Sequence, residues 1–255
     1  MAYNELTIHP LNMGRLLDFD LSLFTARRNM GARQNVPCLA WLILGGDKPV
    51  LVDTGPPAQE FGIKHHRPME QKPEEKLPAV LGKLGVDAAS IEIVVLTHLH
   101  WDHCFNFEYL PKARFIVQQA ELQYAVAPLP IDRHAYEVLM PGLIPPWMAY
   151  YDRIDMICGD MELMPGIQLL HTPGHTPGGQ SVAVETSQGA WVIAGDTVPT
   201  YANWQTDGEK IPSCLTQDLY VYYNTLNRLK KFGNNLLPGH DAKVLEHKVY
   251  PPGIP

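Results

Sequence analysis

The chain has 255 residues, 45% of them hydrophobic and 18% charged, so it is long enough to bury one large core. Its 20 glycines and 23 prolines stay below the level of low-complexity chains, which excludes a disordered or collagen-like protein. The net charge of −7 offers no basic surface to a nucleic-acid backbone, so nucleic acid is not an expected partner. We expect a single domain over residues 1–255.

The sequence carries no pattern of membrane insertion or export. Its longest apolar runs, such as residues 36–44, have strand length and fall far short of the roughly 20 residues that cross a bilayer. Residues 1–24 lack the basic stretch, apolar core and cleavage site of a signal peptide. The four cysteines are widely spaced, without a CxxC pair, which favours free thiols. We therefore expect a cytoplasmic protein without a membrane partner, and the oligomeric state stays open, a homodimer included.

Most predicted elements are strands. Apolar runs over residues 36–44 and 49–52 flank a turn with two glycines and an aspartate, the pattern of a β-hairpin. Further strands are expected, in chain order, over residues 91–96, 114–118, 167–170, 180–184 and 190–194. Several of them are apolar throughout, which is typical of sheets covered on both faces.

Two helices are expected between the strands. Over residues 217–231 apolar side chains recur at helical spacing, with Thr216 placed to cap the start and Gly233 to end the helix. A second helix is expected over residues 75–84, where Pro78 is tolerated only in the first turn. Covered sheets with interspersed helices predict a layered α/β architecture, with two sheets and the helices outside them.

The most informative segment follows the expected strand 91–96. Residues 97–103 read THLHWDH and place three imidazoles and one carboxylate within six residues. Because side chains alternate on a strand exit, His98 and His100 can reach one cation. Asp102 and His103, where the chain turns, can reach a second cation. Imidazole and carboxylate ligands suit zinc, and also manganese, iron or cobalt.

Three further candidate ligands lie downstream, each after an apolar strand and next to glycine. They are His175 in TPGHTPG, Asp196 in AGDT and His240 in LPGHD. Glycine and proline hold the backbone close and fixed there, so a short side chain can reach a shared ion.

This constellation, preceded by the LVDTG segment at residues 51–55, resembles the metallo-β-lactamase-fold hydrolases, and within them the N-acyl-homoserine lactonase-like group. The resemblance implies an αββα sandwich of two mixed β-sheets flanked by helices, with two divalent metal ions, zinc above all, at one edge. Its motifs assign His98, His100 and His175 to one ion and Asp102, His103 and His240 to the other. Asp196 would bridge the two ions, and Asp53 would support the histidine loop from behind.

The resemblance implies a dinuclear hydrolase, a lactonase of the quorum-quenching kind. It would open a lactone or related ester of a small molecule with a hydroxide shared by the two ions. Asp102 is the candidate that passes a proton to the leaving group.

Three departures from the family pattern concern the substrate. Phe105 follows the histidine motif where many relatives have small residues, and Pro199 stands where lactonases commonly carry a tyrosine, so Tyr201 or Trp204 would have to replace it. His65, His66 and Arg67 lie in the region of a loop over the site and could receive an anion. With Trp101 and the ring-rich segment around Trp147, these residues favour an aromatic or carboxylate-bearing substrate.

Other activities compatible with these residues stay open. One is a glyoxalase-like thioester hydrolase, although the usual basic residues of a C-terminal extension are missing here. Another is an iron-dependent oxygenase on the same fold, and a third is a metal-binding sensor without catalysis. A β-lactamase and a nuclease are less favoured, because the sequence shows neither an export signal nor a basic surface.

Overall fold

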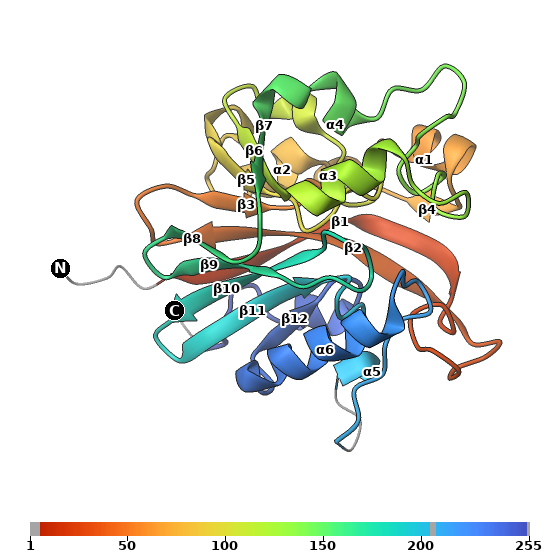
Figure 1. The fold of residues 1–255 in the computed structure, drawn as a ribbon. Helices are drawn as coiled ribbons and strands as arrows, with labels where there is room; N and C mark the ends of the chain where they lie inside the picture. Colours follow the sequence, from red (N-terminus) through yellow and green to blue (C-terminus); the bar gives the residue numbers. More distant parts are fainter. Residues whose placement is uncertain (1–5, 205–207, 254–255) are drawn as a thin grey trace.

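The chain folds into two β-sheets stacked between two layers of helices. The computed structural model describes residues 6–204 and 208–253 (Figure 1). In Figure 1, α2, α3 and α4 lie on one side of the paired sheets, and α5 and α6 lie on the other. The predicted αββα sandwich is confirmed.

The first sheet has the strand order β4-β1-β2-β3-β5-β6-β7. Its first four strands pair antiparallel, and β3, β5, β6 and β7 pair parallel. The strands are β1 (Thr7–Asp20), β2 (Arg33–Leu44), β3 (Val50–Val52), β4 (Met69–Glu70), β5 (Ile93–Val95), β6 (Arg114–Gln118) and β7 (Ile154–Ile157). The predicted hairpin is the β2–β3 pair, with Trp41 opposite Val52.

The second sheet has the order β12-β11-β10-β9-β8. It is antiparallel except for the parallel pair of β11 and β12. The strands are β8 (Met161–Met164), β9 (Ile167–His171), β10 (Gln180–Thr186), β11 (Gly189–Gly195) and β12 (Leu236–Pro238).

Strand β2 shows why the sheets are covered on both faces. Leu39, Trp41 and Ile43 pack into the core between the two sheets. Cys38, Ala40 and Leu42 alternate with them and pack into the core under the first helical layer. The continuous apolar run of this strand therefore serves two cores, as the sequence predicted.

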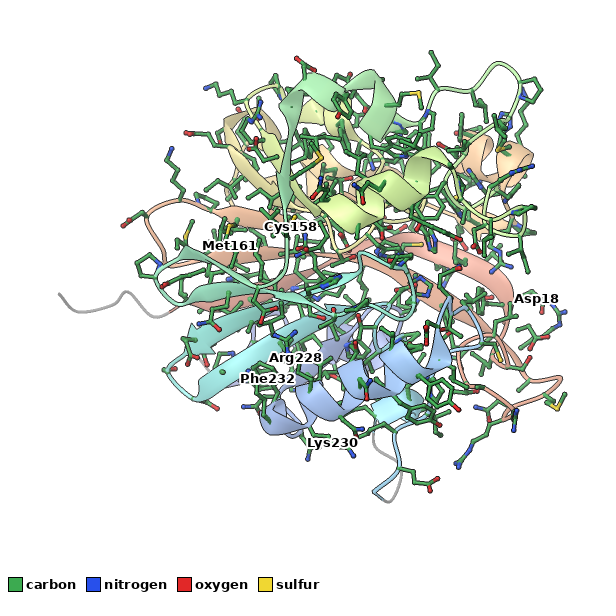
Figure 2. All side chains as sticks on the ribbon, viewed as in Figure 1. Asp18, Cys158, Met161, Arg228, Lys230 and Phe232 are labelled. Carbon is green, nitrogen blue, oxygen red and sulfur yellow. The ribbon has the colours of Figure 1, made fainter. Side chains whose placement is uncertain are left out.

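The helices cover the outer faces of the sheets. The first layer holds α1 (Gln59–His65), α2 (Leu77–Gly82), α3 (Gln119–Val126) and α4 (Pro146–Ala149), and the second holds α5 (Tyr201–Trp204) and α6 (Leu219–Leu229). Pro78 lies in the first turn of α2, where its missing N–H costs no helical hydrogen bond. Arg228, on the sheet side of α6 in Figure 2, forms an ion pair with Asp160 and donates to the His171 carbonyl, 2.8 Å away.

Two details differ from the sequence predictions. Helix α6 is capped by Asp218, whose carboxylate accepts from the Val221 N–H at 2.9 Å, whereas the Thr216 hydroxyl donates to the Gly174 carbonyl. The long strand β1 was not predicted, because two register shifts interrupt its pattern, and the short strands β4, β7, β8 and β12 were not predicted either. None of the described helices has the length and apolar character that a membrane crossing requires.

Candidate metal centre and cavity

The candidate ligands meet where strands of both sheets end. The loop 97–103 follows β5 of the first sheet, and Asp196 follows β11 directly. His240 comes two residues after β12, and His175 lies in the loop between β9 and β10. Residues far apart in the sequence are thereby brought to one edge of the sandwich.

The seven candidates form three overlapping groups. The ligand atoms within each group all lie within 4.8 Å of one another: His98, His100 and His175; His98, His103 and Asp196; Asp102, His103 and His240. The first and third groups contain the same residues that the family resemblance assigns to the two ions. The structure thus brings together all seven residues.

Asp196 lies between the two outer groups. Its Oδ1 is 3.1 Å from His240 Nε2 and 3.4 Å from His103 Nε2, and its Oδ2 is 3.6 Å from His175 Nε2. Each carboxylate oxygen therefore faces a different group, which is the arrangement that a bridging ligand needs. Gly239 makes room for it, since a Cβ at that position would lie 2.5 Å from Asp196 Oδ1.

The outer hydrogen bonds of the imidazoles suit metal binding. Nδ1 of His103 lies 2.8 Å from Asp53 Oδ2, Nδ1 of His240 lies 2.8 Å from the Pro37 carbonyl, and Nδ1 of His175 lies 2.7 Å from the Leu215 carbonyl. These oxygens accept a hydrogen bond, so each Nδ1 carries the proton and each Nε2 presents a lone pair.

The ligand atoms that point toward the centre of the site have no hydrogen-bond donor as a partner. His103 Nε2 and His240 Nε2 face each other at 3.4 Å, and His175 Nε2 faces His100 Nδ1 at 3.2 Å. His98 Nε2 and Asp196 Oδ1 are buried without any hydrogen-bond partner. Converging acceptors of this kind are costly unless a cation lies among them, so the donor set fits two divalent metal ions.

The local charges favour the same conclusion. Burial and the neighbouring imidazoles hold the pKa of His98 and His100 well below the ordinary value, which keeps both neutral as metal ligands must be. At His103 and His240, burial opposes protonation, but the carboxylate of Asp196 raises the pKa overall. The carboxylates thus stabilise positive charge at this site. Without metal, protons on His103 and His240 provide that charge, and a bound metal ion would displace them.

Asp53 supports the histidine loop from the first sheet. Its carboxylate accepts from the Thr97 N–H at 2.7 Å and the Thr97 hydroxyl at 2.8 Å, in addition to His103 Nδ1. Asp53 is fully buried and its φ is 59°, a left-handed backbone that is uncommon outside glycine. Such a conformation persists only where surrounding contacts enforce it, as these three hydrogen bonds do.

Asp53→Asn is expected to weaken metal binding at the group containing His103 by roughly 10- to 100-fold. The asparagine keeps the shape, but its amide nitrogen must face a donor, which favours the His103 tautomer with its proton on Nε2. Metal content and affinity, measured by competition with a chromogenic chelator, check this. Asp155→Asn, at an exposed ion pair with Arg114, is the matched control. Unchanged affinity in Asp53→Asn would disprove the orienting role.

Glu121 is a residue of the site that the sequence analysis missed. From helix α3 its Oε1 accepts from the Leu99 N–H at 3.0 Å and from the Tyr136 hydroxyl at 2.8 Å, while Oε2 accepts from the Gly178 N–H at 3.1 Å. Glu121 is fully buried, and burial raises the pKa of its carboxyl. It ties the loop of His98 and His100 to the loop of His175. A Cβ on Gly178 would lie 2.0 Å from the Glu121 nitrogen, so this approach requires glycine.

A cavity of about 540 Å³ opens onto the centre. Its polar floor includes His100, Asp102, His175, Asp196 and His240. Its walls are largely apolar and come from the last part of β1 and the segment after it, the loop 129–135 and the segment 214–217. The wall residues include Leu16, Phe19, Leu23, Phe24, Trp101, Leu129, Ile131 and Leu215. A volume of this size is typical of small-molecule sites.

Three of the expected substrate-binding residues line this cavity: His66, Arg67 and Trp101. His66 stacks on Trp101 with ring centroids 4.1 Å apart, and its Nε2 lies 2.7 Å from Glu137 Oε1. His65 and Phe105 instead pack against Phe61 and are not among the lining residues.

Two expectations about aromatic side chains do not match the cavity lining: a pocket lined by the ring-rich segment around Trp147, and Tyr201 or Trp204 in place of the tyrosine missing at Pro199. Trp147 is buried in the core under the first helical layer, and Trp204 is buried in the core under α6, where its indole donates to the Gly233 carbonyl. Tyr201 packs against the core between the sheets. Large apolar rings gain more from full burial than from a wet cavity. Among the described residues, the cavity lining contains no tyrosine in place of Pro199.

The fold and the ligand arrangement define the class. Residues 33–247 match the profile of the Metallo-beta-lactamase superfamily. The chain therefore belongs to the metallo-β-lactamase superfamily, as the sequence predicted.

Within this superfamily the chain is similar to N-acyl homoserine lactonases, which confirms the second part of the predicted resemblance. It is 28% identical to the N-acyl homoserine lactonase of Bacillus thuringiensis over 227 residues, which cover 84% of each protein. It is also 28% identical to the lactonase AiiB of Agrobacterium fabrum, over 82% of this chain and 81% of that protein.

Solved structures give the same result. A B. thuringiensis AiiA mutant with N-decanoyl-L-homoserine bound at the active site has a TM-score of 0.76 and 25% identity, over 95% of this chain and 96% of that chain. An N-acyl homoserine lactone hydrolase with N-hexanoyl-L-homoserine at its catalytic metal centre has a TM-score of 0.75 and 25% identity, over 96% of each chain. Fold, ligand arrangement and relatives agree with the expected dinuclear hydrolase.

Proposed function

We propose that this protein hydrolyses the ester bond of lactones at a centre of two divalent metal ions, with N-acyl homoserine lactones as the reference substrates. The observation that carries the proposal is the position of Asp196 between two histidine groups at the floor of an apolar cavity. The relatives named N-acyl homoserine lactonase support the substrate class.

The ligand set favours zinc. Five imidazoles and two carboxylates form a nitrogen-rich site that suits zinc, and manganese, iron or cobalt fit the same ligand types. His98, His100 and His175 would hold one ion, and Asp102, His103 and His240 the other, with Asp196 between them. When bound, the two ions supply a water of lowered pKa and polarise the ester carbonyl.

Lactone hydrolysis consumes one water. A bond forms between the water oxygen and the carbonyl carbon, the ring C–O bond breaks, and one proton moves to the leaving oxygen. We infer that Asp102 passes this proton. Its side chain lines the cavity and keeps 12% of its surface exposed, while its Oδ2 lies 3.7 Å from His240 Nε2. Trp101, stacked on His66, lines the same cavity as the ligands.

We expect the zinc-loaded protein to open N-hexanoyl-homoserine lactone, releasing one proton per turnover that a pH indicator detects. Metal removal with a chelator should abolish the reaction, and added zinc should restore it. S-lactoylglutathione tests the thioester alternative, and oxygen uptake by iron-loaded protein tests the oxygenase alternative. Turnover of the thioester without turnover of any lactone would contradict the proposal.

Three sequence expectations stay predictions alongside this proposal. They are the single domain over residues 1–255, the cytoplasmic location and an oligomeric state that includes a homodimer. Cell fractionation and size-exclusion chromatography with light scattering test the last two.

A further inference from the structure

A column of stacked side chains connects the metal centre to Arg67. The ring of Phe24 stacks on that of His240 at 5.1 Å, and Phe19 stacks on Phe24 at 4.2 Å. The Arg67 guanidinium carbon then lies 4.4 Å above the centroid of the Phe19 ring. Arg67, Phe19, Phe24 and His240 all line the cavity. One wall of the cavity therefore runs from a metal ligand, over two apolar rings, to a cation.

The backbone around Arg67 is well fixed. Its N–H donates to the Gly62 carbonyl at the end of α1, and the carbonyl of the next residue, Pro68, accepts from the Leu17 N–H of β1. Both hydrogen bonds measure 2.9 to 3.0 Å. The backbone that carries the Arg67 side chain is thus fixed by α1 on one side and by β1 on the other.

Arg67 forms no ion pair with a carboxylate in the part of the chain that the structure describes. Across residues 6–204 and 208–253, the ion pairs within 4.0 Å include Arg15, Arg33, Arg114 and Arg228, but not Arg67. The guanidinium is half-buried, and burial lowers its pKa, with Asp102 acting in the opposite direction. Arginine nevertheless keeps its charge, so a partly desolvated cation faces the cavity.

The three acidic side chains that line the cavity interact with groups other than Arg67. Asp102 and Asp196 belong to the metal groups. Asp132 accepts hydrogen bonds from the Tyr124 hydroxyl and from Gln217 Nε2, both to its Oδ2 at 2.5 Å. Two divalent ions at the floor would outweigh the charges of Asp102 and Asp196. The cavity is therefore set up to attract negative charge, although the whole chain carries a net charge of −7.

From this arrangement we infer that Arg67 determines substrate specificity by binding a carboxylate, or a similar planar anion, at the far end of a lactone substrate. The inference rests on the proposed lactone hydrolysis and names the class of substrate. The reacting ring lies over the metal centre, and an apolar linker lies along Phe24 and Phe19. The anion receives the fork of N–H donors that a guanidinium offers to a carboxylate.

The apolar surface between the metal centre and Arg67 determines which linker the substrate can carry. Leu16, Leu23 and the two phenylalanines contribute no hydrogen-bonding side chain, so an aliphatic or aromatic linker matches them better than a polar one. The three stacking steps from His240 to Arg67 imply a linker of several atoms. An optimum in linker length is therefore expected, because a carboxylate that stops short leaves the guanidinium unpaired.

A matched series of substrates tests this inference. The probes are homoserine lactones acylated with succinyl, glutaryl and adipoyl groups, each as the free acid and as its methyl ester. For the best linker length, wild-type protein is expected to prefer the acid by about 10- to 100-fold in kcat/KM. Arg67→Met should abolish that preference mainly through KM, and leave the methyl esters within about threefold of wild type.

The controls separate recognition from folding and from general charge. Lys64→Met removes an exposed cation three residues before Arg67, in the last turn of α1, and should keep the preference for the acid. Arg67→Lys retains the charge without the planar fork and should keep part of the preference. Circular dichroism and melting temperature show whether Arg67→Met is folded. If Arg67→Met is not folded, Arg67→Lys tests the inference instead: a reduced preference for the free acid would support it, and an unchanged preference would contradict it.

Two results would overturn the inference: equal kcat/KM for acid and methyl ester at every linker length, or an equal loss for both in Arg67→Met. If wild-type protein opens none of the lactones, the proposed function fails. Calorimetric titration with ring-opened N-glutaryl-homoserine and its side-chain methyl ester then still tests Arg67. Tighter binding of the free acid, lost in Arg67→Met, would support the inference, and equal binding would refute it.

Discussion

Asp196→Ala is expected to lose both metal ions and the lactonase activity together. Each oxygen of this carboxylate faces a different group of imidazoles, so its removal deprives both positions of a ligand and of negative charge. We expect the metal content to fall from about two equivalents toward zero after dialysis, with kcat/KM reduced by roughly 1,000-fold or more. Elemental analysis and initial rates on the same preparation check this.

Asp241→Ala, next to His240, is the control for this variant. Its carboxylate faces away from the ligands and accepts from the Tyr201 and Lys243 N–H groups. It should retain both ions. An Asp196→Ala protein that keeps one tightly bound equivalent would show that Asp196 serves a single ion and does not bridge.

Glu121→Ala is expected to have the second largest effect, on stability as well as on metal binding. It leaves three buried donors, the N–H groups of Leu99 and Gly178 and the Tyr136 hydroxyl, without their acceptor. We expect a loss of about 3–5 kcal/mol in the free energy of unfolding. For a chain of this length that corresponds to roughly 6–20 °C in melting temperature.

Weaker metal binding in Glu121→Ala would identify Glu121 as a positioning residue. His98, His100 and His175 lie on the two loops that it joins, so the affinity for the ion at that group should fall about 10- to 100-fold. Gln123→Ala, at an exposed position of the same helix, is the control and should change neither property by more than a small amount. A lower melting temperature with unchanged metal affinity would restrict Glu121 to a purely structural role.

The sequence predicted the metal ligands well because their signal is local. The motif at residues 97–103 concentrates ligands on one strand exit, and the downstream candidates share a strand followed by glycine. Strands β2, β3, β5, β6, β9, β10 and β11 were predicted for a related reason, since short continuous apolar runs bounded by turn residues are typical of strands in covered sheets. Strand β1 was missed because its bulges interrupt the pattern that would reveal it, and β4, β7, β8 and β12 were missed because they are only two to four residues long.

The sequence could not predict which way the rings face. Trp101 lines the cavity while Trp147 and Trp204 are buried in two different cores, and all three are simply aromatic in the sequence. Glu121 was missed for a related reason. A lone acidic residue on a short helix is usually exposed, and only the tertiary structure shows that loops from both sheets converge on it.

The spread of the ligands along the chain bears on how the protein matures in the cell. Four of them lie between residues 98 and 103, but the last, His240, comes 137 residues after His103. During synthesis, the early histidines emerge from the ribosome long before their partners on the second sheet. The complete pair of ion sites would form only after synthesis has reached His240 and the two sheets have docked, so loading with metal would follow both events.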